Sequence, residues 1–198
     1  ALMLSIMSGF TQQDLIRNQY MYDLYLANPA FAGNEQGLST TLTYRKQWAG
    51  FTGAPVTQTL TLHAPTKGGR TGLGLAVLND KIGARTVTSF TGTYSYRVRV
   101  GAGKLSFGMN LGMVQNNYDL SQIDYQDQGD PIVQNGRENN VVANIDAGLL
   151  FFTRATYIGF SAYHLSGSKY DVYEGSESRQ YMHLVAVAGH AFDLSERF

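Results

Sequence analysis

Polar and apolar residues alternate along residues 37–65, and the alternation is cleanest in the second half of this stretch. On one side fall Thr57, Thr59, Thr61 and His63, and on the other Gln58, Leu60 and Leu62. A period of two is the spacing of a β-strand that has one polar and one apolar face. Gly50, Gly53 and Pro55 interrupt the pattern and favour a turn. The stretch therefore predicts two strands joined by a loop.

The same alternation recurs at steady spacing along the rest of the chain. Further strands are predicted at residues 70–78, 86–100, 104–114, 141–152, 155–165 and 181–192. Several of them reach the about 9–11 residues that a tilted strand needs to cross a bilayer. Small residues on the polar faces suit a filled lumen, and apolar residues on the other faces suit lipid. The pattern predicts an all-β fold, an antiparallel transmembrane β-barrel of the outer-membrane type with about eight strands in this chain.

The connections between the predicted strands alternate in length. In chain order they are residues 46–55 (long), 65–69 (short), 79–84 (intermediate), 101–103 (short), 115–140 (very long), 153–154 (short) and 166–180 (long). Outer-membrane barrels have short periplasmic turns and longer external loops. If the N-terminus is periplasmic, every short turn falls inside and every long loop outside. A soluble β-sandwich, the alternative fold, has no reason to keep this rhythm.

Composition excludes several other classes of protein. The 198 residues contain 15 Lys and Arg and 15 Asp and Glu, so the net charge is zero and no nucleic-acid partner is predicted. Charged residues make up 15%, below the about 25% of soluble domains, and Gly (22) and Tyr (13) are abundant. Cysteine is absent, which excludes disulfides and Cys-based zinc sites. No apolar run approaches the about 18 residues that would predict a transmembrane helix.

The N-terminal part of the chain divides into two segments ahead of the barrel. Residues 1–11 hold a short apolar run followed by small residues, which predicts the remnant of a signal peptide, with a short buried strand or helix as the alternative. Residues 12–36 are rich in aromatic side chains and are interrupted at Asn28-Pro29 and Gly33. We expect them to be a periplasmic lead-in that docks on the barrel mouth or on a periplasmic protein. Residues 37–198 form the predicted barrel.

A succession of short motifs accompanies this pattern and is densest in the first half of the chain. It comprises Asn28-Pro29-Ala30-Phe31-Ala32-Gly33, Tyr44-Arg45-Lys46-Gln47-Trp48, Gly50-Phe51, Gly53-Ala54-Pro55, Gln58-Thr59, His63-Ala64-Pro65, Gly72-Leu73-Gly74, Asn79-Asp80-Lys81-Ile82-Gly83, and, in the second half, Tyr163-His164 with Gly167. In this order the motifs resemble the PorP/SprF family, which belongs to the type IX secretion and gliding machinery of the Bacteroidetes.

The resemblance implies an outer-membrane β-barrel without enzymatic activity. Its relatives act with periplasmic ring proteins of the secretion apparatus, or help to secrete and anchor a surface adhesin. Members of the family are longer, so the resemblance also implies that this chain is truncated and that its eight strands are part of a larger barrel. The alternative function is a passive outer-membrane pore or uptake channel.

Candidate chemistry is sparse, and the sequence predicts no catalytic, cofactor or metal site. The four histidines (His63, His164, His183 and His190) are far apart and show no catalytic spacing, so we interpret them as lumen or interface residues. Gly72 and Gly74 lie inside a predicted strand, where glycine allows bending or close packing. Oxygen-rich loops can bind calcium, and residues 115–140 contain Asp119, Asp124, Asp127, Asp130 and Glu138, although their spacing matches no EF-hand.

Partner-binding candidates gather at one predicted external strand end. Arg45, Lys46, Trp48 and Phe51 stand at or beside the first long connection, where a secreted partner could contact them. Trp48 is also suited to the aromatic belt at the boundary with outer-membrane lipid. The long connection at residues 115–140 is expected to face the cell exterior and to be available to the secreted adhesin.

Overall fold

The structure, a computed structural model, describes residues 23–119, 137–170 and 178–192. Eight strands form one antiparallel sheet in the order β1-β2-β3-β4-β5-β6-β7-β10. They are β1 (Ser39–Lys46), β2 (Val56–Pro65), β3 (Thr71–Ile82), β4 (Arg85–Val100), β5 (Gly103–Asp119), β6 (Arg137–Phe152), β7 (Thr156–Tyr163) and β10 (His183–His190). The antiparallel barrel architecture with about eight strands, predicted from the alternation, is confirmed.

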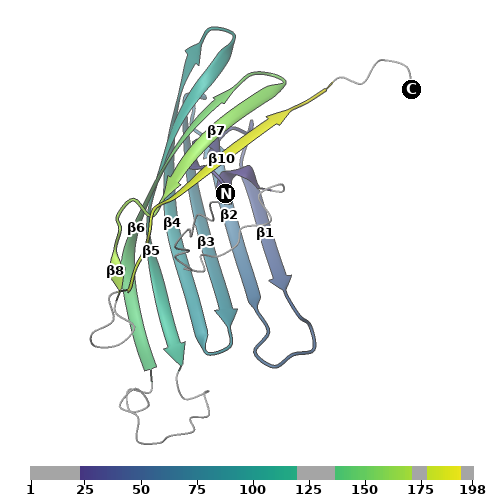
Figure 1. Ribbon diagram of the computed structural model, residues 1–198. Coiled ribbons are helices and arrows are strands. Elements are labelled where there is room, and N and C mark those ends of the chain that lie inside the picture. Colours follow the sequence, from purple (N-terminus) through teal and green to yellow (C-terminus); the bar gives the residue numbers. More distant parts are fainter. Residues whose placement is uncertain (1–22, 120–136, 171–177, 193–198) are drawn as a thin grey trace, which may run out of the picture.

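The sheet curls into a half-barrel, and β1 and β10 are its edge strands (Figure 1). Two short 3-10 helices, η1 (Leu24–Leu26) and η2 (Pro29–Phe31), precede β1 and lie inside the curl. The strands β8 (Lys169–Tyr170) and β9 (Ser178–Arg179) follow β7 in the sequence and pair with each other in a separate two-stranded sheet. Among the described residues, no helix has both the length and the apolar character needed to cross a membrane.

The two faces of the sheet differ as the alternation predicts. The face turned away from η1 and η2 carries exposed apolar side chains, among them Leu42, Leu75, Phe90, Tyr94, Phe107, Met109, Leu111, Leu149 and Phe160. The inner face carries buried polar side chains, among them Thr59, Thr61, Thr93, Ser95, Ser106, Asn110, Asn144, Asp146 and Ser161. An apolar outer surface over a polar interior is the arrangement of a barrel wall in lipid.

The central strands are longer than the sequence pattern predicted. β4, β5 and β6 have 16, 17 and 16 residues, which at about 3.3 Å per residue exceeds the about 30 Å of a bilayer core. Most of the added length lies at one end, where β5 runs on to Asp119 and β6 already begins at Arg137. Polar contacts hold the strands together there, as where Asn79 Nδ2 donates to Thr88 Oγ1 at 2.9 Å.

One predicted connection is wrong because the strands on both sides of it are longer than predicted. The intermediate loop expected at residues 79–84 is a two-residue turn at Gly83 and Ala84, because β3 and β4 stay paired up to Ile82 and Arg85. Gly83 has a φ of 56°, the left-handed conformation that tight hairpins require. The other short turns, at residues 66–70, 101–102 and 153–155, share the opposite end of the half-barrel, hereafter the short-turn end. The end that holds the turn at Gly83 and the connection at residues 47–55 is the long-loop end.

The outer face leads to a test at Met109, the middle residue of an exposed stripe that runs from Phe107 to Leu111. Replacing Met109 with Arg should lower the free energy of unfolding in lipid vesicles by about 2–4 kcal/mol, the cost of a charge at mid-membrane depth. The control is Ala102→Arg, in the exposed turn between β4 and β5, where the same charge should have little effect. Equal destabilisation by both variants, measured by urea titration, would contradict the assigned face.

Candidate functional site

The described part of the predicted lead-in, residues 23–33, lies against the inner face of the sheet and is called the inner segment here. Two side-chain caps define its turns. Asp23 Oδ1 accepts from the Tyr25 N–H at 3.1 Å, and Asn28 Oδ1 accepts from the Ala30 N–H at 2.9 Å. Pro29 occupies the first position of η2, where its fixed φ suits a helix start. Asn28-Pro29, predicted to interrupt structure, therefore starts a 3-10 turn.

Serine hydroxyls of the wall hydrogen-bond the main chain of the inner segment. Ser161 on β7 donates to the Ala27 carbonyl at 2.8 Å. Ser106 on β5 and Ser95 on β4 donate to the carbonyls of Ala30 and Ala32 at 2.7 and 2.6 Å. A buried carbonyl without a partner is costly, and the two short turns of this segment pair only part of its own carbonyls. The wall therefore supplies the hydrogen bonds that a helix or sheet would otherwise provide.

Asn28 connects the inner segment to two strands of the wall, and its side chain is fully buried. Its Nδ2 donates to the carbonyls of Leu149 and Phe160, at 3.0 and 3.1 Å. These two residues face each other across β6 and β7, so that a single amide bridges both strands. A Cβ at Gly148 would lie 2.1 Å from Asn28 Oδ1, and one at Gly159 2.8 Å from Nδ2. Any larger residue at Gly148 or Gly159 would therefore clash with the Asn28 side chain.

Three more inner-face glycines lie directly beneath the inner segment. A Cβ at Gly72 would lie 2.2 Å from the Ala32 carbonyl oxygen, one at Gly74 would lie 2.7 Å from the Tyr25 hydroxyl, and one at Gly108 would lie 2.2 Å from the Ala30 nitrogen. The sequence predicted either bending or close packing at Gly72 and Gly74, and the structure shows close packing. The inner face is thus a seat shaped for this segment.

A chain of hydrogen bonds continues from the inner segment into the wall. Thr93 donates its hydroxyl proton to Asn110 Oδ1 at 2.6 Å, so Tyr25 must be the donor in the 2.6 Å contact between the Tyr25 and Thr93 hydroxyls. Burial raises the pKa of Tyr25 to about 12, and the phenol therefore keeps its proton at neutral pH. Asn110 Nδ2 in turn donates to Asp146, whose carboxylate also accepts from Asn144 Nδ2 and the His164 N–H. The buried carboxylate is fully engaged in the wall.

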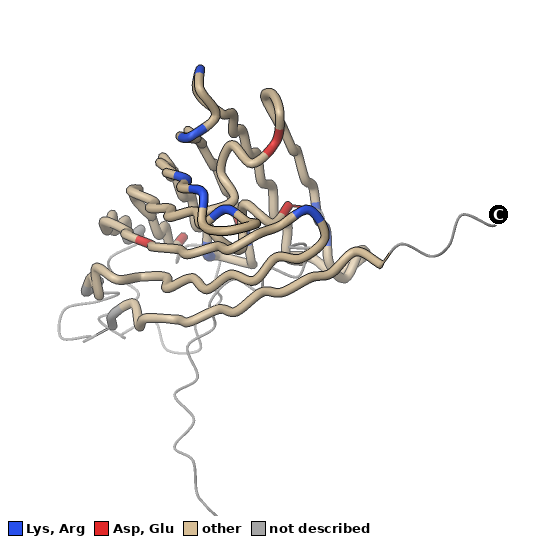
Figure 2. The backbone as a smooth tube through the Cα atoms, turned by 90° about the horizontal axis from the view of Figure 1, so that it is seen from above, with Lys and Arg blue, Asp and Glu red and all other residues tan. Residues whose placement is uncertain are grey.

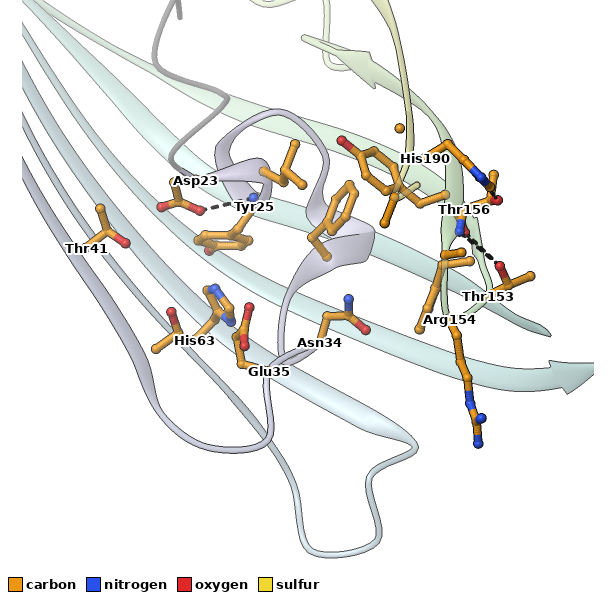
Figure 3. Close-up of a pocket in the computed structure, with 18 residues that line it drawn as sticks. Asp23, Tyr25, Asn34, Glu35, Thr41, His63, Thr153, Arg154, Thr156 and His190 are labelled. Atoms are coloured by element: carbon orange, nitrogen blue, oxygen red, sulfur yellow. Dashed lines mark hydrogen bonds between the residues drawn. The ribbon is translucent and has the colours of Figure 1, made fainter. Parts of the chain in front are cut away.

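A cavity of about 550 Å³ opens beside the inner segment at the short-turn end (Figure 3). Its lining includes Asp23, Tyr25, Glu35, His63, Arg154 and His190. Two of the four histidines thus line the same cavity. In each of them Nδ1 already has a partner in the protein: His63 Nδ1 accepts from the Gly33 N–H at 3.1 Å, and His190 Nδ1 lies 2.6 Å from the Thr156 hydroxyl. No group of three or more metal-binding side chains occurs in the part of the chain that the structure describes.

The predicted partner-binding residues lie at the long-loop end, away from this cavity. Trp48 and Phe51 are exposed by 71% and 77%, Lys46 is exposed, and Arg45 is half-buried. The Phe51 N–H donates to the Trp48 carbonyl at 3.2 Å, which closes a tight turn that presents both rings. Binding of a partner by these four residues stays a prediction. Residues 1–11 and the acidic residues Asp124, Asp127 and Asp130 lie outside the described residues.

Reasoning from the sequence missed the seat itself. Ser95, Ser106 and Ser161 looked like ordinary polar residues of strands, and nothing in their spacing marks them as donors to another segment. The signal that could have found the seat is the compact Asn28–Gly33 motif together with glycines at alternate strand positions, such as Gly72 and Gly74.

The seat leads to a test at Gly108. Replacing Gly108 with Ala should loosen the inner segment by about 1–3 kcal/mol, the usual cost of overpacking a tight contact. Amide hydrogens of residues 23–33 should then exchange about ten- to a hundredfold faster by mass spectrometry. Gly92→Ala is the matched control, because a Cβ there would meet only the Leu111 carbonyl oxygen at 3.8 Å. Unchanged exchange in the Gly108 variant would show that the seat does not hold the segment.

Comparison with known proteins places the chain in one family. The family described as "Type IX secretion system membrane protein PorP/SprF" matches residues 9–198, nearly the whole chain. No curated protein and no solved structure matches the chain. The match agrees with the outward apolar face and the barrel-like sheet, which mark a membrane protein. The chain therefore belongs to the PorP/SprF family of type IX secretion system membrane proteins.

Proposed function

We propose that this protein is an outer-membrane component of the type IX secretion and gliding machinery that helps to secrete or anchor a surface adhesin. In this proposal the short-turn end faces the periplasm, where it contacts ring proteins of the secretion apparatus, and the long-loop end faces the exterior. This orientation is based on the general rule that outer-membrane barrels have short turns on the periplasmic side and longer loops outside. Three short turns share one end here; the other end holds the longer connection at residues 47–55 together with the two-residue turn at Gly83 and Ala84.

The observation that carries the proposal is the occupied interior of the half-barrel. Asn28, Ala30 and Ala32 are buried against the wall and hydrogen-bonded to it, where a passive pore would need an open passage. The inner-face groups that could otherwise line a channel, such as Thr93 and Asp146, are engaged in the same network. We therefore favour a role in holding and presenting other proteins over free diffusion of solutes. The proposal includes no enzymatic activity and no cofactor.

The external contact proposed for the adhesin is the turn that carries Trp48 and Phe51. Large aromatic side chains are enriched among the residues that dominate protein–protein binding energy. Both rings are mostly exposed at the long-loop end, and the basic residues Arg45 and Lys46 stand beside them. An exposed aromatic pair with adjacent positive charge suits a protein partner that offers apolar pockets and acidic rims.

This contact can be tested in cells. Replacing both Trp48 and Phe51 with Ala should reduce surface display of the cognate adhesin by about tenfold or more, if the two rings each contribute the 1–2 kcal/mol typical of a binding anchor. Barrel abundance should stay normal, because neither ring is buried in the wall. Adhesin at the cell surface and barrel in the membrane fraction are measured separately in a strain that carries only the variant.

The matched control for this experiment is Ile82→Ala. Ile82 is also apolar, is 47% exposed, and stands at the same end on a different hairpin. Display should be unaffected in this control. Normal display in the Trp48 and Phe51 variant would remove this turn from the mechanism.

The pore alternative has its own test. Purified protein in planar bilayers should give small or no steady ion currents, because the inner segment occupies part of the interior that a pore would use. Large, steady currents from the unmodified protein would favour the channel over the proposed function.

A further inference from the structure

Basic side chains gather on the inner face of the sheet at the short-turn end. On β4 the buried positions Thr93, Ser95 and Arg97 lead to Arg99 on the same face, and on β5 Lys104 precedes the buried Ser106 by two residues. Arg99 and Lys104 face each other directly in the register. Arg97, Arg99 and Lys104 are called the inner basic cluster here.

Arg97 is the most constrained member of the cluster. Its side chain is 8% exposed, and neither its Nε nor its Nη2 has a hydrogen-bond partner. Gly33 of the inner segment lies so close that a Cβ there would be 2.9 Å from Nη2. A buried guanidinium with unmade hydrogen bonds is destabilising, and so are like charges directly opposite each other, as at Arg99 and Lys104. An anion bound among these side chains would relieve both costs.

The acidic residues described at this end leave the cluster positively charged. They are Asp23, whose carboxylate is already taken by Thr61 Oγ1 at 2.5 Å and the Tyr25 N–H, and Glu35, which is exposed beside the cavity. The basic residues at the same end are Lys67, Arg70, Arg97, Arg99, Lys104 and Arg154. In the view along the half-barrel, Lys and Arg outnumber Asp and Glu along the described chain (Figure 2). Among the described residues, this end of the half-barrel is therefore basic.

The position of the cluster favours a polypeptide over lipid. Arg97, Arg99 and Lys104 share the face of the inner segment, opposite the apolar side chains Tyr94 and Phe107, which face lipid. The cluster is linked to the cavity of about 550 Å³ through Phe152: this ring lines the cavity, and its centre lies 5.8 Å from Lys104 Nζ. A space of this size accepts several side chains.

We propose that the inner basic cluster binds the carboxylates of an acidic polypeptide segment that enters the half-barrel at the short-turn end. The planar guanidinium of Arg97 suits a carboxylate, because its paired N–H groups match the two oxygens. Arg99 and Lys104 would add attraction that depends on salt concentration. The inference rests on the proposed function only in assigning this end to the periplasm, and the binding chemistry does not depend on that assignment.

The test uses the whole protein in nanodiscs and a short fluorescent peptide in which Glu alternates with Thr. Fluorescence anisotropy should show binding that weakens with added salt, and the same peptide with Gln in place of Glu should bind at least about tenfold more weakly. Arg97→Gln should weaken binding of the Glu peptide about tenfold or more. Because Arg97 is buried, the exposed pair Arg99→Gln with Lys104→Gln is tested as well, and it should also weaken binding.

The matched control replaces Arg45 and Lys46 with Gln at the long-loop end, which should leave peptide binding unchanged. Equal binding of the Glu and Gln peptides, or equal loss in the control variant, would overturn the proposal. If the cluster variants instead lost binding to phosphatidylglycerol vesicles and kept the peptide, the cluster would be a lipid site and the proposal would be wrong. Labelling of a cysteine introduced at Lys67 in intact cells reports the orientation separately, so exposure of the short-turn end to the exterior would contradict only the proposed function.

Discussion

The structure depends on one constraint, the need to satisfy the buried main chain of the inner segment. Residues 23–33 have only two short 3-10 turns, so the carbonyls that these turns leave unpaired must find partners in the wall. Ser95, Ser106 and Ser161 meet that need from three different strands, and the Asn28 amide reaches two more carbonyls in return. Because the donors come from β4, β5 and β7, the segment links β7 to two strands with which it does not pair.

This constraint explains why the inner face is built from small residues. Glycine at Gly72 and Gly108 lets the main chain of the inner segment approach to distances that any side chain would block, and Gly148 does the same for the side chain of Asn28. The outer face has the opposite requirement, since Phe90, Met109 and similar side chains must present apolar surface to lipid. Each strand therefore carries two unrelated demands on alternate residues, which is why the chain is rich in glycine and poor in charge.

The same architecture divides the charges along the half-barrel. Three basic residues near the short-turn end, Arg97, Arg99 and Lys104, lie on the inner face, where the carboxylates of Asp23 and Asp146 are already hydrogen-bonded. The aromatic pair Trp48 and Phe51 stands at the other end, beyond the reach of that cluster. A wall with one segment seated inside and different chemistry at its two ends is suited to contacts with different proteins on the two sides of a membrane.

The sequence by itself determined the all-β class, the presence of about eight strands and, where the alternation is clear, the face that side chains take, because a period of two depends only on local backbone geometry. It did not determine the two-residue turn at Gly83 or the full length of β5 and β6, since polar residues at strand ends pair only when a neighbour is present. The sequence also did not predict the seat, because Ser106 and Gly108 are distant in sequence from Ala30 and only the curl of the sheet brings them together. The unpaired Arg97 follows from the same cause, because burial of a charge is decided by what packs over it.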